Sequence, residues 1–187
     1  MKELRPFFTP FYTDMLYIED SVVEEVRKMR NTDKGVLLSN AGGWHSSFYQ
    51  SIENPIISPL VDDIMFKMKR VYSEYGISKD PAINNLFFTV NKRYNYTVSH
   101  NHPFSYFGVV LYLRVPRNSG AIVFDRPDPS PAWIEVDEYN DRNRPVFKVQ
   151  PKAGALIIFP SYMRHSVEQN VTDEYDDERI TMVMNIK

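Results

Sequence analysis

Hydrophobic and polar positions follow two different periods along this chain. Between residues 20 and 75, apolar side chains recur every three or four positions, which predicts amphipathic helices that pack by one face. One predicted helix runs from Asp20 or Ser21, where a short polar side chain can cap it, to about Arg30. The second covers about Ser58–Tyr75 and stops before a glycine.

From about residue 84 the period changes to two, which is typical of β-strands. Clusters of Pro, Gly, Asn and Asp separate the alternating segments. The predicted strands are Leu86–Asn91, Tyr94–His100, Phe107–Val115, Ala121–Phe124, Trp133–Val136, Val146–Val149, Ala155–Phe159, Arg164–Gln169 and Arg179–Ile186. Helices followed by many short strands predict a mainly β sandwich or barrel with flanking helices. We expect a single domain over residues 1–187, with a helical and loop support layer in 1–83 and a β-core in 84–187.

The last predicted strand has one apolar and one mixed face. Its even-numbered residues, from 180 to 186, are all Ile or Met and are suited to packing on the helices. Its other face carries Arg179 and Thr181. An arginine that points into a β-core needs an anion to meet it, because a buried unpaired charge is very costly. Arg179 is therefore a candidate anion-binding residue, unless it pairs with an acidic residue of the preceding turn.

Two of the four histidines lie one residue apart, in Ser99-His100-Asn101-His102-Pro103. Residues two apart on a strand point to the same face, so His100 and His102 can converge on one point. A third imidazole from another strand would complete a three-ligand metal site with open coordination positions. Tyr94 and Tyr96 share the parity of His100. The simpler alternative is a pair of turn histidines at the surface.

Composition excludes several classes of chemistry. The chain has no cysteine, which excludes disulfides, thiolate metal sites and cysteine nucleophiles. Its formal net charge of −2 gives no basic footprint for nucleic acid. The N-terminus lacks the apolar core of a signal peptide, and no apolar run is long enough to span a bilayer. We expect a cytoplasmic protein with no membrane partner, compatible with a homodimer.

An ordered series of short motifs runs from about Gly42 to the C-terminus. It comprises Gly42-Gly43-Trp44, the Asn91 to Asn95 stretch, His100-Asn101-His102-Pro103, Leu111-Tyr112-Leu113, Ser119-Gly120, Gly154 to Pro160, His165 and Arg179-Ile180-Thr181. Each piece is weak alone, but the order is fairly specific. The chain resembles the Fe(II)/2-oxoglutarate-dependent oxygenases, in particular small phage and bacterial members related to prolyl hydroxylases.

The resemblance implies a double-stranded β-helix, the jelly-roll or cupin-like core. It implies that His100, His102 and His165 hold Fe(II), with His102 at the position that is Asp or Glu in the wider superfamily. Arg179 would bind the distal carboxylate of 2-oxoglutarate with help from the Thr181 hydroxyl, and Tyr94 or Tyr96 could add a hydrogen bond. Three coordination positions stay free, two for the 2-oxo acid and one for O₂.

Two departures from the family pattern are visible. The second ligand is a histidine, which changes the charge of the site by one unit; alternatively His102 only shapes the site and a water fills the position. The gap from His165 to Arg179 is longer than usual for the superfamily, and the acidic run of residues 172–178 would absorb it as a hairpin loop.

Three functions follow from these residues. The first is a dioxygenase that hydroxylates an unidentified small molecule or peptide side chain. The second is a cupin-like three-histidine metalloenzyme that uses no 2-oxoglutarate. The third is a non-catalytic jelly-roll module for binding or structure. The sequence does not identify the substrate.

Overall fold

The computed structural model describes residues 8–128, 135–173 and 177–187. Its helices are α1 (Asp20–Thr32) and α2 (Ser58–Glu74). Its strands are β1 (Tyr12–Met15), β2 (Asn40–Ala41), β3 (Trp44–His45), β4 (Ile83–Asn91), β5 (Tyr96–His100), β6 (Phe107–Arg114), β7 (Ile122–Asp125), β8 (Val146–Val149), β9 (Ala155–Pro160), β10 (His165–Val167) and β11 (Arg179–Ile186).

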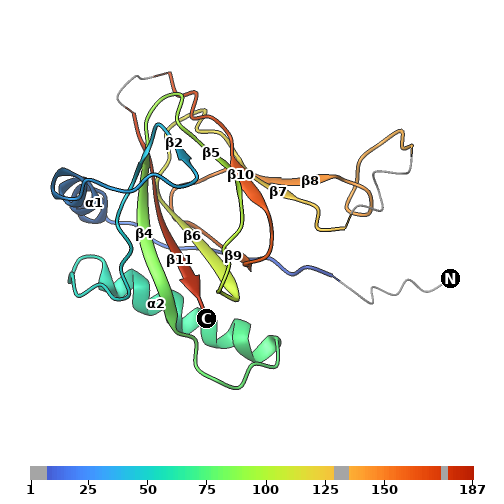
Figure 1. Cartoon of the computed structure of the whole chain (residues 1–187), viewed down its shortest axis with the longest axis horizontal. Helices are drawn as coiled ribbons and strands as arrows, with labels where there is room; N and C mark the ends of the chain where they lie inside the picture. The colour runs from blue at the N-terminus through green and yellow to red at the C-terminus, as the bar shows by residue number, and fades with distance from the viewer. Residues whose placement is uncertain (1–7, 129–134, 174–176) are drawn as a thin grey trace.

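These strands form two antiparallel sheets (Figure 1). The larger sheet has the order β1-β9-β6-β11-β4-β3, and the smaller has the order β2-β5-β10-β7-β8. Most strands pair with strands that are distant in the sequence. The last strand, β11, for example, lies between β4 and β6. The predicted mainly β fold with flanking helices is confirmed.

The two faces of the larger sheet bury separate apolar clusters. The even-numbered residues of β11 pack with α1 and α2 in one core, which covers the outer face of this sheet. The second core lies between the sheets and joins Phe87, Val110 and Val183 to Phe124 of the smaller sheet. The parity predicted for β11 is therefore confirmed, and its odd-numbered residues face the space between the sheets.

Some boundaries predicted from the sequence were wrong. β5 begins at Tyr96 instead of Tyr94, because Tyr94 has a φ of +69° and cannot continue a strand. The prediction missed β1, β2 and β3, which are short and pair with strands far away in the sequence. Half of the predicted strand Trp133–Val136 lies outside the described residues, and its described half, 135–136, forms no strand. Residues 174–176 of the predicted acidic hairpin loop also lie outside them.

The Gly42-Gly43-Trp44 segment joins the two sheets along one edge. β2 pairs with β5 of the smaller sheet, and β3 pairs with β4 of the larger one. A Cβ atom at Gly43 would lie 2.2 Å from the Asn91 Oδ1 atom, so any larger residue here would force the buried Asn91 side chain to shift. The segment thus carries His45 to the inner side of the larger sheet.

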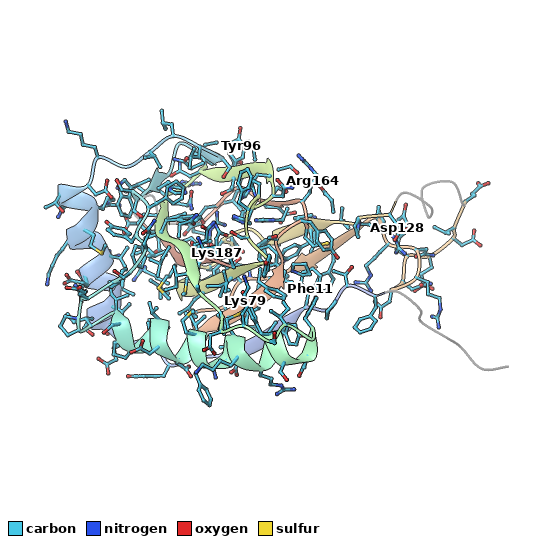
Figure 2. All side chains as sticks on the ribbon, turned by 60° about the horizontal axis from the view of Figure 1, so that its bottom comes forward. Phe11, Lys79, Tyr96, Asp128, Arg164 and Lys187 are labelled. Carbon is cyan, nitrogen blue, oxygen red and sulfur yellow. The ribbon has the colours of Figure 1, made fainter. Side chains whose placement is uncertain are left out.

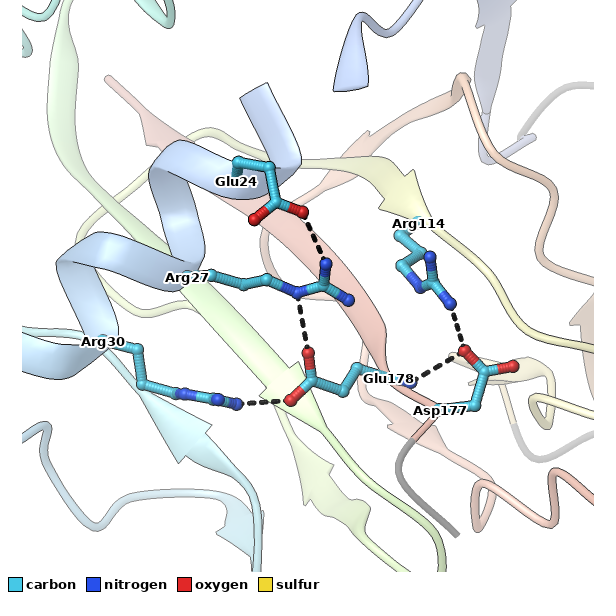
Figure 3. Close-up of polar contacts among 6 residues, drawn as sticks. All are labelled: Glu24, Arg27, Arg30, Arg114, Asp177 and Glu178. Carbon is cyan, nitrogen blue, oxygen red and sulfur yellow. Dashed lines mark hydrogen bonds and ion pairs between the residues drawn. The ribbon is translucent and has the colours of Figure 1, made fainter. Parts of the chain in front are cut away.

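Helix α1 is tied to the start of β11 by buried charge (Figure 3). The carboxylate of Glu178 is 4% exposed and accepts hydrogen bonds from Arg27 Nε at 3.1 Å and Arg30 Nη1 at 2.5 Å. Next to it, Asp177 pairs with Arg114 of β6. These contacts fix the backbone immediately before Arg179.

Replacing Glu178 by glutamine is expected to lower the free energy of unfolding by about 1–3 kcal/mol, because hydrogen bonds to charged groups are lost at a buried position. Chemical denaturation measures this value. The matched control is Glu24→Gln, which removes the exposed partner of the same Arg27 and should cost about 0.3–0.5 kcal/mol. Equal losses in the two variants would show that the Glu178 contacts contribute no special stability.

Candidate active site

Three histidines converge where β5 and β10 meet. His100 ends β5, His102 follows two residues later, and His165 begins β10 directly opposite His100. One ligand atom from each lies within 4.8 Å of the other two, and the Nε2 atoms of His102 and His165 are 3.2 Å apart. Two nitrogens bound to one ion at about 2.1 Å and near a right angle lie roughly 3 Å apart. The arrangement therefore fits a metal ion bound by three imidazoles.

Backbone carbonyls orient two of these rings. The Nδ1 atom of His100 lies 2.9 Å from the Val98 carbonyl oxygen, and Nδ1 of His165 lies 3.0 Å from that of Met163. A carbonyl can only accept, so both Nδ1 atoms carry the proton. The lone pair is left on Nε2, which is the usual arrangement of metal-binding histidines.

Burial keeps the three imidazoles neutral. Burial, with a smaller contribution from the neighbouring histidines, lowers the pKa of His102 to about 3 and that of His165 to about 4. The pKa of His100 is also lowered, chiefly by burial. A metal ion binds only to unprotonated imidazole. Because these histidines are neutral near pH 7, the site can bind a metal ion without first losing protons to solvent.

The same shifts predict that the metal-free protein loses stability in mild acid. The pKa of a histidine in the unfolded chain is near 6.5. Below this pH the unfolded chain is protonated at these histidines, while the buried His102 and His165 of the folded protein stay neutral. Stability is full above pH 6.5 and falls by up to about 2 kcal/mol per histidine at pH 5. Denaturation of metal-free protein at pH 7 and pH 5 measures the loss, and His102→Asn should reduce it by up to about 2 kcal/mol. An unchanged slope in that variant would contradict this assignment.

The pairing of β5 with β10 is irregular just before His100. His165 lies opposite His100 but Val167 lies opposite Thr97, so β5 has one more residue than β10 in this interval. Such a bulge reverses the parity. Thr97 therefore faces the cavity with His100, while Tyr94 and Tyr96 are 55% and 42% exposed.

The predicted common face of Tyr94, Tyr96 and His100 is therefore wrong. Neither tyrosine lines the cavity, and in Figure 2 Tyr96 lies at the periphery of the molecule near Arg164. A bulge leaves little trace in the residue pattern, so simple alternation could not reveal it.

Arg179 lies in the wall of the same cavity and is 1% exposed. Its Nη1 atom donates to the Ser119 carbonyl oxygen, with longer contacts to those of Gly120 and Glu168. Its Nη2 atom is buried and has no hydrogen-bond partner among the described residues. Burial lowers the pKa of Arg179, yet the guanidinium keeps its charge. An anion in the cavity would supply the missing partner.

Polar side chains beside Arg179 extend this anion site. The Thr181 hydroxyl is 2.7 Å from that of Thr89, and both line the cavity. Tyr112 is buried there too, and burial raises its pKa to about 12, so its hydroxyl stays protonated. Tyr112 was not among the predicted site residues, although it shares its strand face with Val110 and therefore points inward.

His45 also reaches the cavity, from the segment that joins the sheets. Its ring stacks on Phe87 with centroids 4.1 Å apart, and its Nδ1 atom is 2.7 Å from the Ser46 carbonyl oxygen. It does not belong to the group of described residues that could hold a metal. His45 therefore forms part of the cavity wall.

A comparison with protein families decides the class. The family described as "Putative 2OG-Fe(II) oxygenase" matches residues 85–185, which is more than half of the chain and includes all three histidines and Arg179. The chain belongs to the 2OG-Fe(II) oxygenases. It is thus an oxidoreductase whose cofactors are Fe(II) and 2-oxoglutarate. No curated protein matches its sequence.

Solved structures share the fold of this oxygenase at low sequence identity. A prolyl-4-hydroxylase from Pseudomonas putida is 13% identical with a TM-score of 0.68, over 95% of this chain and 91% of that one. The viral collagen prolyl hydroxylase of Paramecium Bursaria Chlorella virus-1, solved with 2-oxoglutarate, is 14% identical with a TM-score of 0.59, over 94% of both chains.

HygX from Streptomyces hygroscopicus, solved with nickel and 2-oxoglutarate bound, is 11% identical with a TM-score of 0.64, over 95% of this chain and 82% of that one. These likenesses confirm the predicted jelly-roll core. None of the described helices is long and apolar enough to cross a membrane.

Proposed function

We propose that this oxygenase hydroxylates a carbon of its substrate while it decarboxylates 2-oxoglutarate. One oxygen atom of O₂ enters the substrate C–H bond and the other enters succinate, with CO₂ released. His100, His102 and His165 hold Fe(II), and Arg179 and Thr181 anchor 2-oxoglutarate. The observation that carries this proposal is a buried, unpaired guanidinium nitrogen in the same cavity as three converging imidazoles.

Each side chain has a defined task in this scheme. The Nη2 atom of Arg179 donates to the distal carboxylate of 2-oxoglutarate, and the hydroxyls of Thr181 and Tyr112 donate to the same group. This anchoring turns the 2-oxo acid end toward the histidines. The bound iron supplies the activation of O₂.

Apolar residues separate the histidines from Arg179 and keep the site dry. Val110, Ile122 and Val183 line the cavity between the two sheets. Water that reached the iron would compete with O₂ and would allow side reactions, so an apolar wall protects the chemistry. Ser39 and Asn40, at the start of β2, complete the polar part of the wall.

The substrate is proposed to be a peptide side chain or a small molecule. The structural neighbours include prolyl hydroxylases, one in complex with a hypoxia inducible factor peptide fragment, and HygX, solved with hygromycin B.

Anaerobic titration with Fe(II), with and without 2-oxoglutarate, tests the proposal. A visible charge-transfer band that needs both components is the expected result, because it reports a 2-oxo acid chelated to iron. After oxygen is admitted, 2-oxoglutarate should be consumed and succinate formed in equal amounts. Bound iron without a band would favour the cupin-like enzyme, and no bound iron would favour the passive module.

A further inference from the structure

We infer that the substrate carries a monoanionic acidic group, a carboxylate, which enters the cavity beside 2-oxoglutarate. The inference rests on the proposed function, since it takes Fe(II) at the histidines and 2-oxoglutarate at Arg179. It starts from the composition of the cavity wall. Among the residues that the structure describes, the wall contains Arg179 and four histidines, but no Asp or Glu.

The charges in the loaded cavity do not balance. A metal-bound imidazole is neutral, because its lone pair cannot hold both the metal and a proton. Iron brings two positive charges, Arg179 brings one, and the carboxylates of 2-oxoglutarate bring two negative charges. One positive charge remains. A carboxylate at the position of His102 would have cancelled it.

Charged groups around the cavity leave this excess largely uncancelled. The carboxylate of Asp33 acts on His45, but it is partly exposed and held by neutral donors of Ser47 and Tyr49, so solvent screens its charge. Asp125 and Arg164 both contact Ser99 near His100, at 3.3 Å each, and their opposite charges offset one another. The carboxylate of Glu168 is occupied by Lys148 at 2.6 Å and by the backbone nitrogen of Ala121 at 3.0 Å. An uncompensated charge is costly in a buried space, so the loaded cavity favours a further anion and disfavours a cation.

The wall also offers hydrogen-bond donors for that anion. The side chains of Ser39 and Thr97 line the cavity. Ser39 directly precedes β2, and its carbonyl oxygen accepts a hydrogen bond from the backbone nitrogen of Val98 in β5 at 2.9 Å. Their hydroxyl groups can donate to a carboxylate while its charge offsets the excess of the site.

Binding of small probes to the Co(II)-loaded full chain tests this inference without a known substrate. With saturating 2-oxoglutarate, the visible spectrum of Co(II) is followed during titration with acetate, azide or neutral acetamide. Dialysis with labelled 2-oxoglutarate checks that the probes do not displace it. His102→Asp and His102→Asn are nearly identical in shape and differ by one charge. Acetate should bind the wild type and His102→Asn at least tenfold more tightly than His102→Asp, and acetamide should not bind.

Other outcomes separate the possibilities. Equal acetate affinity in the wild type and His102→Asp, or acetamide that binds as well as acetate, would overturn the inference. Binding of azide but not acetate would show that a small inorganic anion balances the positive charge, and would overturn the inference of a carboxylate on the substrate. If 2-oxoglutarate itself fails to bind the Co(II) protein, the proposed function fails and the inference falls with it. If 2-oxoglutarate binds and acetate does not, only the inference fails.

Discussion

Replacing Arg179 by methionine is expected to weaken 2-oxoglutarate binding by about 100-fold or more. The side chain is almost fully buried, and its free Nη2 atom is the one unpaired charged donor in the described cavity wall. Without it, the distal carboxylate of 2-oxoglutarate would be buried without its cationic partner, which costs about 3–5 kcal/mol. Methionine fills a similar volume, so the core can remain packed.

Calorimetric titration of 2-oxoglutarate into the Mn(II)-loaded protein measures this loss. A thermal shift provides a second readout, because a ligand at about 100 times its Kd stabilises the fold by about 2.7 kcal/mol, and Arg179→Met should lose this gain. Arg164→Ala is the control: this arginine is exposed near His100 but outside the cavity wall, so its removal should change affinity less than threefold. Wild-type affinity in Arg179→Met would remove the anchor from the proposed function.

Much of the site could be predicted from the sequence because it lies on regular strands. Alternation along β11 placed Arg179 and Thr181 on the inner face, and the structure puts both in the cavity wall. The spacing of His100 and His102 brought two imidazoles together, and His165 joins them through direct pairing of β10 with β5. Along β11 the two-residue period translates directly into a side-chain direction, whereas His102 lies just beyond the end of β5 and His165 is placed by strand pairing.

The prediction failed where the backbone departs from that period. The bulge in β5 reverses which residues face inward, so Thr97 replaced the tyrosines in the wall. The strands that carry the Gly42-Gly43 turn are two residues long, too short for any periodic pattern. These short segments are strands only because they pair with β5 and β4, and such long-range pairing cannot be read from the local residue pattern.

Metal affinity after substitution of each histidine is expected to show that His102 is a metal ligand. Alanine at His100, His102 or His165 should each weaken Mn(II) or Fe(II) binding by more than about 100-fold. Changes to groups that only support metal ligands already cost 10- to 100-fold, and removal of a ligand itself should cost more. His102 is expected to behave like the other two because its Nε2 atom lies 3.2 Å from that of His165.

His45→Ala supplies the matched control, since this fourth histidine lines the same cavity but stands apart from the metal-binding group. Its metal affinity should stay within about threefold of wild type, as measured by anaerobic competition with a chelating dye. If His102→Ala also kept wild-type affinity, His102 would only shape the site and a water would take its position.

The charge count of the loaded cavity would not change, because water and imidazole are both neutral. The carboxylate inference would then survive, but His102→Asp would no longer be a valid test of it.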